Sequence, residues 1–393
     1  MNPPPGPPRL DTDALIDDRR TRIIVCCGSG GVGKTTAAAA LGLRAAERGR
    51  HVVVLTVDPA RRLAQSMGLT HLDNIPRPVD AAFSSGGSLH AMMLDMKRTF
   101  DEIVEAHADP DRAAQILANP FYQSLSSSFA GTQEYMAMEK LGQLYRTDEW
   151  DLIVVDTPPS RSALDFLDAP QRLGRFLDGR LIRLLTAPAS PGRAYMKVLN
   201  AGFSIVTGTL TKVLGAQVLK DMQTFVTAFD TMFGGFRERA ESTYRLLQTP
   251  GTSFIVVAAP EPDALREASY FVERLAAERM PLAGLILNRV HIPVVTRLSA
   301  ARSVAAAETL ENHEAGNGSG TGEPPRYALA AGVLRLHAER MQLAARERRV
   351  AEHFTSAHPT VPVTEVVAQP EDVHDLEGLR TIGSSLASEP GLS

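Results

Sequence analysis

The sequence is poor in lysine, cysteine and aromatic side chains. Only six of its 393 residues are lysines, and arginine supplies the other 35 of the 41 basic residues. Against 45 acidic residues this leaves a net charge of −4, so no overall positive field favours binding to nucleic acid. Hydrophobic residues make up 44% of the chain, which is enough to bury a large core and excludes wholesale disorder.

Cysteine and long apolar runs are equally scarce. The two cysteines, Cys26 and Cys27, are adjacent, so in a strand their side chains point to opposite faces and cannot easily share a metal ion. We therefore expect reduced thiols and a cytoplasmic protein. No apolar run reaches the about 18 residues that a membrane-spanning helix needs. Residues 1–20 lack the apolar stretch of a signal peptide, and we expect a disordered lead-in there.

Short β-branched runs alternate with helical patterns along the chain. This alternation predicts an α/β fold with a mostly parallel sheet of about seven strands, flanked by helices. Several of the runs are apolar throughout, as expected for strands that are buried on both faces. The predicted strands are residues 22–27, 51–57, 89–96, 151–156, 253–258, 282–289 and 361–366, and a long helix is predicted over residues 327–354.

Two longer stretches, residues 97–150 and 161–250, interrupt this alternation and predict helical insertions. We expect them to belong to one domain that spans residues 21–380. Within this domain, the glycine-rich residues 312–325 predict a flexible loop. The polar residues 381–393 predict a frayed tail.

Glycine-rich residues follow the first predicted strand and fit the phosphate-binding pattern G-x-x-x-x-G-K-[ST] in full. Backbone N–H groups of such a loop surround a phosphate, and the dipole of the following helix adds positive potential. We expect Lys34 to reach the β- and γ-phosphates, Thr35 to hold Mg²⁺ and Thr36 to bind the α-phosphate. The predicted loop consists of Gly28, Ser29, Gly30, Gly31, Val32, Gly33, Lys34, Thr35 and Thr36. The sequence therefore predicts a site for a nucleoside triphosphate and Mg²⁺.

Two aspartates stand at the carboxyl ends of predicted strands. Asp58 follows the apolar run 52–57, and Asp156 ends the run 151–156. The carboxyl ends of parallel strands meet beside the crevice where ligands bind, so both carboxylates are expected near the phosphates. Either aspartate taken alone could instead cap a helix.

Together these segments resemble the ATPases with a deviant phosphate-binding loop, which include the arsenical-pump, tail-anchored-protein-targeting, nitrogenase iron-protein and ParA/MinD proteins. The resemblance is carried by Gly30–Thr36, by Val52–Ala60 and by Trp150–Pro159. Asp58 lies 98 residues before Asp156, which lies 132 residues before Asn288. These distances favour the arsenical-pump and tail-anchored-protein-targeting (ArsA/GET-type) branch over the shorter ParA/MinD proteins.

The resemblance implies roles for individual residues in binding and hydrolysing ATP. Asp58 resembles the aspartate that orients the attacking water, and Asp156 resembles the one that holds Mg²⁺ through a water molecule. Asn288 resembles the residue that reads the adenine, because its amide offers a donor and an acceptor, although it could also cap a turn. Pro370 begins the segment Pro370-Glu371-Asp372-Val373, which resembles the late loop that covers the base.

The second position of the glycine-rich loop departs from the family pattern. The family has a lysine there that crosses a dimer interface to the partner's phosphates, whereas this chain has Ser29. A neutral hydroxyl cannot supply that charge, which puts a symmetric homodimer in doubt. The charge could come from a paralogous partner subunit with an intact lysine, or from Arg61, Arg62 or Arg161. Alternatively, the chain binds nucleotide with little turnover.

Residues 196–233, in the second insertion, carry apolar side chains at helical spacing, several of them methionine and phenylalanine. The corresponding region of the ArsA/GET-type ATPases holds hydrophobic helices, so this face could bind a hydrophobic client; it could also pack on the core or on a dimer partner. A single loop and the lack of a thiol triad argue against arsenite transport. We therefore predict a cytoplasmic, dimeric, Mg²⁺-dependent ATPase that couples its nucleotide state to a client. The alternatives are a nucleotide-gated scaffold with negligible turnover and a ParA/MinD-like partitioning ATPase.

Overall fold

The computed structural model describes residues 7–58, 62–120, 122, 123, 126, 132–158, 238–293, 295–316 and 327–387. These residues include all the predicted strands and the whole glycine-rich loop. The predictions for Arg61, Arg161, the side chain of Arg62 and the face at residues 196–233 lie outside the described residues.

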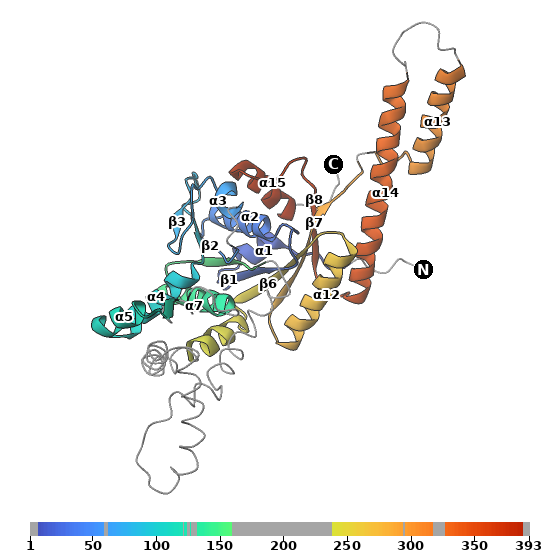
Figure 1. Cartoon of the computed structure of the whole chain (residues 1–393). Coiled ribbons are helices and arrows are strands. Elements are labelled where there is room, and N and C mark those ends of the chain that lie inside the picture. Colours follow the sequence, from blue (N-terminus) through green and yellow to red (C-terminus); the bar gives the residue numbers. More distant parts are fainter. Residues whose placement is uncertain are drawn as a thin grey trace, which may run out of the picture.

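An eight-stranded sheet in the order β3-β4-β2-β5-β1-β6-β7-β8 forms the centre of the molecule (Figure 1). All neighbouring strands are parallel except β3 and β4, which confirms the predicted α/β fold with a mostly parallel sheet. The strands are β1 (Ile23–Cys27), β2 (His51–Thr56), β3 (Arg77–Pro78), β4 (Ser88–Met93), β5 (Leu152–Asp156), β6 (Thr252–Ala258), β7 (Leu282–Val290) and β8 (Val363–Val367). Only β3 was not predicted, because two residues, one of them proline, are too short to show a pattern.

Helices cover both faces of this sheet. α2 (Lys34–Glu47) and α15 (Leu376–Ala387) lie on one face, and α7 (Thr132–Thr147) and α12 (Pro262–Ala277) lie on the other (Figure 1). The run of alanines in α2 lets its backbone approach the sheet closely, and a Cβ on its Gly42 would lie 2.5 Å from Cγ2 of Val54. Shorter helices are α3 (Arg62–Ser66), α4 (Met96–His107), α5 (Pro110–Leu117) and a helix over residues 238–247.

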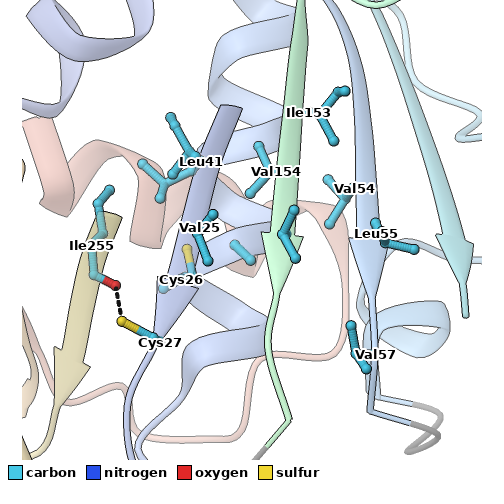
Figure 2. Close-up of a cluster of buried hydrophobic side chains, with 14 of the residues drawn as sticks. Val25, Cys26, Cys27, Leu41, Val54, Leu55, Val57, Ile153, Val154 and Ile255 are labelled. Carbon is cyan, nitrogen blue, oxygen red and sulfur yellow. Dashed lines mark hydrogen bonds between the residues drawn. The ribbon is translucent and has the colours of Figure 1, made fainter. Parts of the chain in front are cut away.

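The central strands are buried on both faces, as their apolar sequences predict. All five residues of β1 and of β5 are buried, and Figure 2 shows their side chains packed with those of β2 and α2. Both cysteines lie in this core as free thiols, and Sγ of Cys27 lies 3.6 Å from the backbone oxygen of Ile255. Burial raises the pKa of Cys27 to about 12, so this thiol stays protonated and unreactive at neutral pH.

A helix replaces the second half of the expected disordered lead-in. α1 (Thr12–Asp17) packs on α2, with Ile16 fully buried and Asp13 hydrogen-bonded to Arg44 at 2.5 and 2.6 Å. The helix has six residues, so its sequence carries too short a pattern to be predicted. Its order depends on partners about thirty positions further along the chain, which only the fold brings near.

Two helices form an antiparallel pair that projects away from the sheet, and we call this pair the arm (Figure 1). It consists of α13 (Ala300–Gly316) and α14 (Ala328–Ala357), the latter confirming the predicted long helix. α13 includes residues 312–316, where a flexible loop was expected, and Glu311 near its end pairs with Arg335 of α14. Among the described residues, no helix is both long and apolar enough to cross a membrane.

The expected frayed tail is helical in its first part. α15 continues to Ala387 and buries Ile382 and Leu386, and it packs against α2, where a Cβ on Gly383 would lie 3.6 Å from the Ala40 oxygen. These side chains recur at helical spacing, but Ser384 and Ser385 lie between them and mask the pattern in the sequence.

Candidate functional site

The glycine-rich loop connects β1 to α2 at the carboxyl edge of the sheet. Gly28, Gly31 and Gly33 have φ values of 149°, 78° and 94°, which residues with side chains rarely adopt. A Cβ at Gly28 would lie 2.1 Å from the backbone oxygen of Val257, in the neighbouring strand β6. No side chain caps the start of α2. The first N–H groups of the helix are therefore open to an anion.

Lys34, the first residue of α2, is held inside this loop. Its side chain is 5% exposed, and its ammonium donates a hydrogen bond of 2.7 Å to the backbone oxygen of Ser29. Burial lowers the pKa of Lys34, although Asp156 nearby partly opposes this shift. A phosphate in the loop would give the buried ammonium a second counter-charge, which fits the predicted role of Lys34.

Asp156 ends β5 beside the loop and is fully buried. One of its oxygens, Oδ2, accepts hydrogen bonds from the hydroxyls of Thr35 at 2.7 Å and Thr56 at 2.9 Å. Burial raises the pKa of Asp156 to about 6, while these two hydrogen bonds lower it. The other oxygen, Oδ1, is buried without a hydrogen-bond partner among the described residues.

This arrangement fits a Mg²⁺ ion. Mg²⁺ keeps several of its waters and is commonly held by one or two protein oxygens together with substrate phosphates. The uncommitted Oδ1 of Asp156 and the hydroxyl of Thr35 are oxygens of this kind. The described residues contain no cluster of three histidine, cysteine, aspartate or glutamate side chains that would hold a metal by themselves. The two oxygens beside the phosphate-binding loop would suit a magnesium ion that arrives with a nucleotide.

Val57 and Asp58, which follow β2, lie next to Asp156, and we call these two residues switch I. Its path is set by contacts that the sequence did not predict. The backbone N–H of Asp58 donates to the Thr56 hydroxyl at 3.2 Å, and the N–H of Val57 donates to the backbone oxygen of Asp156 at 3.0 Å. From the other side, the amide of Gln133 in α7 donates to the Val57 oxygen at 2.9 Å. A buried threonine at the end of an otherwise apolar strand was the available signal for the first contact.

Asn288 reaches the glycine-rich loop from the end of β7. Its amide donates a hydrogen bond of 2.8 Å to the backbone oxygen of Val32, and its Nδ2 occupies the space that a Cβ on Gly33 would fill. The amide therefore supports the loop. Its role toward adenine stays a prediction.

Pro370 is exposed in the loop after β8, at the same edge of the sheet. β7 and β8 pair as far as Val290 and Val367. The guanidinium of Arg289 lies 4.0 Å from the carboxylate of Asp372, two residues beyond Pro370. The structure thus brings the segment around Pro370 near the end of β7. Its role as a cover for the base stays a prediction.

Comparison with known proteins agrees with this geometry. A sequence model of the family described as anion-transporting ATPase matches residues 21–300. The chain is 26% identical over 288 residues to the ATPase GET3 of Malassezia globosa, covering 73% of this chain and 77% of the relative. It is also 26% identical over 284 residues to an ATPase ASNA1 homolog of Cryptosporidium parvum, covering 72% of this chain and 68% of the relative.

Proposed function

This chain belongs to the family of anion-transporting ATPases, and we propose that it binds ATP with Mg²⁺ and hydrolyses it to ADP and phosphate. One observation carries the proposal: the hydroxyl of Thr35 meets the buried carboxylate of Asp156 at 2.7 Å beside the buried ammonium of Lys34. A buried carboxylate with one uncommitted oxygen is costly unless a cation or its waters satisfy it. The relatives named as ATPases support the same reaction.

The reaction needs groups that stabilise charge and orient water. Water adds to the γ-phosphorus while the bond from that phosphorus to the β–γ bridging oxygen breaks, which leaves ADP and phosphate. Lys34 stabilises the negative charge on the phosphate oxygens, and the carboxylate of Asp58 orients the water. When bound, Mg²⁺ neutralises charge on the β- and γ-phosphates, and Thr35 and Asp156 are the residues that would hold it.

Ser29 leaves the reaction short of one positive charge relative to the family pattern. Our proposal assigns that charge to a partner ATPase subunit that has a lysine at the equivalent position, in a dimer with this chain. The same serine favours a second candidate function, a nucleotide-gated scaffold with negligible turnover of its own. The two differ in whether hydrolysis appears when the partner is present.

The nucleotide state would be passed to a client through the helices beside switch I. Gln133 joins the Val57 oxygen to the first turns of α7, so a movement of switch I would act directly on this helix. The apolar residues 196–233 are the proposed place for a hydrophobic client helix. This part of the proposal rests on the sequence pattern and on the family resemblance.

Measuring nucleotide binding and hydrolysis separately tests the proposal. Lys34→Ala should weaken ATP binding about 10- to 100-fold, because a charge-assisted hydrogen bond to phosphate is lost. Asp58→Asn should keep ATP affinity and lower turnover by about 100-fold or more. Lys97→Ala is the control, since Lys97 is half exposed on α4, where it pairs with Asp101. Unchanged turnover in Asp58→Asn would contradict the assigned chemistry.

Isolating the tagged Asp58→Asn protein with ATP from its own cells tests the dimer. A paralogous subunit that carries the missing lysine should copurify and should raise the turnover of wild-type protein. Brisk hydrolysis by a purified homodimer would remove the reason for a partner. Absence of turnover with every copurified subunit would favour the scaffold.

A further inference from the structure

Thr56 links the two aspartates of the proposed site through one hydroxyl. β2 and β5 are neighbouring strands, and their register places Thr56 directly beside Asp156. The Thr56 hydroxyl donates to Oδ2 of Asp156 at 2.9 Å and accepts from the N–H of Asp58 at 3.2 Å. It thus lies between the carboxylate predicted to hold Mg²⁺ and the residue predicted to orient water.

The hydroxyl is committed in both directions. A threonine has one O–H proton, and a carboxylate is a stronger acceptor than the backbone oxygen of Asp58, which lies further away at 3.4 Å. The side chain is only 1% exposed, so water cannot replace these partners easily. The five residues before Thr56 in β2 (His51-Val52-Val53-Val54-Leu55) include four apolar side chains, and valine would fill nearly the same volume as threonine. Packing alone therefore gives no reason for a hydroxyl here.

The backbone around Thr56 is held so that this link acts on switch I. The N–H of Val57 donates to the backbone oxygen of Asp156, and its carbonyl accepts from Gln133. Val57 is therefore fixed between β5 and α7, and the direction of the chain at Asp58 depends on the next hydrogen bond, from its N–H to the Thr56 hydroxyl. The Thr56 hydroxyl oxygen therefore helps to fix the backbone from which the Asp58 side chain extends.

We propose that Thr56 is a positioning residue that holds the switch I carboxylate of Asp58 in a set place relative to the magnesium-binding carboxylate of Asp156. The inference rests on the proposed ATP hydrolysis and names a residue that acts on this reaction through Asp58 and Asp156. Loss of the hydroxyl removes one of the two O–H donors of Asp156 Oδ2 and one acceptor of the Asp58 N–H. Groups that orient a metal-binding side chain in this way typically change metal affinity or activity by about 10- to 100-fold.

Three variants test Thr56. Thr56→Val should lower kcat for ATP by about 10- to 100-fold, change KM less than about 3-fold and raise the Mg²⁺ concentration needed for half-maximal nucleotide binding. Thr56→Ser keeps the hydroxyl and should restore both values. Thr252→Val is the matched control, because Thr252 is equally buried, in β6, and its hydroxyl donates to the Leu246 oxygen away from the site.

The outcomes separate this role from a structural one. Wild-type kcat and Mg²⁺ dependence in Thr56→Val would overturn the proposal, as would no rescue by Thr56→Ser or equal losses in Thr252→Val. In single-turnover measurements, Thr56→Val should add little to the loss already caused by Asp58→Asn; full additivity would show that Thr56 does not act through Asp58.

A second readout separates this inference from the proposed function. The Mg²⁺ dependence of binding is followed with a fluorescent ATP analogue, which requires no turnover. Wild-type protein that binds the analogue with Mg²⁺ but hydrolyses no ATP, alone or with its partner, contradicts the proposed hydrolysis. In that case an unchanged Mg²⁺ dependence in Thr56→Val still overturns the link to Asp156, and a changed one upholds that link.

Discussion

The carboxyl edge of the sheet and the arm are built on opposite principles. At the sheet edge, Lys34, Thr56 and Asp156 are buried. Thr56 is hydrogen-bonded to Asp156 and Lys34 to the Ser29 oxygen, and Gly28 and Gly33 leave no room for a Cβ. On the arm, Leu329 is 82% exposed and Leu336 is 55% exposed, and a Cβ on Gly332 would meet no atom within 4 Å. Dense polar contacts hold the site in one arrangement. The arm is held mainly by the packing of its two helices on each other and by its root, which we define as the contact of Glu347 in α14 with His291 after β7.

Because of this difference, the same kind of substitution is expected to affect stability differently at the sheet edge and on the arm. A glycine at the sheet edge is required by backbone geometry, but a glycine in an exposed helix only adds freedom to the unfolded chain. An ion pair near the sheet joins distant segments, but an ion pair on the arm joins two exposed helices. Five substitutions test this contrast.

Gly28→Ala should have the largest effect. The new Cβ would lie 2.1 Å from the Val257 oxygen, and φ at this position is 149°, so β1, β6 or the loop must shift. We expect a loss of about 3 kcal/mol or more in the free energy of unfolding, together with loss of ATP binding. Chemical denaturation and nucleotide titration measure the two effects. Near wild-type values for both would show that the sheet edge is less crowded than the structure indicates.

Glu347→Ala tests the root of the arm. Glu347 of α14 is 8% exposed. Its carboxylate accepts a hydrogen bond of 2.9 Å from the backbone N–H of His291 and lies 2.7 Å from Nδ1 of the same residue. Removing these contacts should cost about 1–3 kcal/mol and should lower hydrogen-exchange protection in α13 and α14 but not in β1. Glu339→Ala, on the exposed side of the same helix, is the control. An equal loss of protection in β1 would contradict the separation of the two regions.

Asp13→Asn tests the ion pair between α1 and α2, which belong to the part of the molecule around the sheet that we call the body. The Arg44 guanidinium that hydrogen-bonds Asp13 lowers the pKa of this carboxyl below its ordinary value of 3.8. The pair therefore stabilises the fold above about pH 4, and this contribution disappears as the pH falls through the lowered pKa. We expect Asp13→Asn to lower the free energy of unfolding by about 0.5–1 kcal/mol at pH 7, and we expect this loss to vanish at strongly acidic pH. Urea denaturation at several pH values measures the effect.

The arm offers the matching ion pair. Arg335 also lowers the pKa of Glu311 by hydrogen bonding, but both side chains are nearly half exposed. Glu311→Gln should change the stability less than Asp13→Asn at pH 7, because solvent screens this pair. An equal or larger loss in Glu311→Gln would contradict the contrast between body and arm.

Gly332→Ala should have the smallest effect and the opposite sign. The position lies inside α14, a Cβ there is open to solvent, and alanine favours the helix. We expect a gain of about 0.5–1 kcal/mol in local helix stability, seen as slower hydrogen exchange in α14. Faster exchange would show that another group covers this face of the arm.

Much of the fold and part of the site could be predicted because the signals are local. Seven strands show as apolar runs, and the phosphate-binding loop shows as adjacent glycines, Lys34 and Thr35 at fixed spacing. The short helix α1 and the end of α15 could not be predicted, since their order depends on contacts with α2, which is distant in the sequence. The strand β3 was missed because two residues show no periodicity.

The sequence by itself determined the chemistry of the loop between β1 and α2, because residues that are neighbours in the chain stay neighbours in space. Only the tertiary structure decided which side chains meet this loop. Thr56, Asp156 and Asn288 come from three different strands, and parallel pairing brings their ends to one edge. The Thr56 hydroxyl acquires Asp156 as a partner through that register, whereas the N–H of Asp58 is a neighbour in the chain. The register is set by packing over the whole sheet.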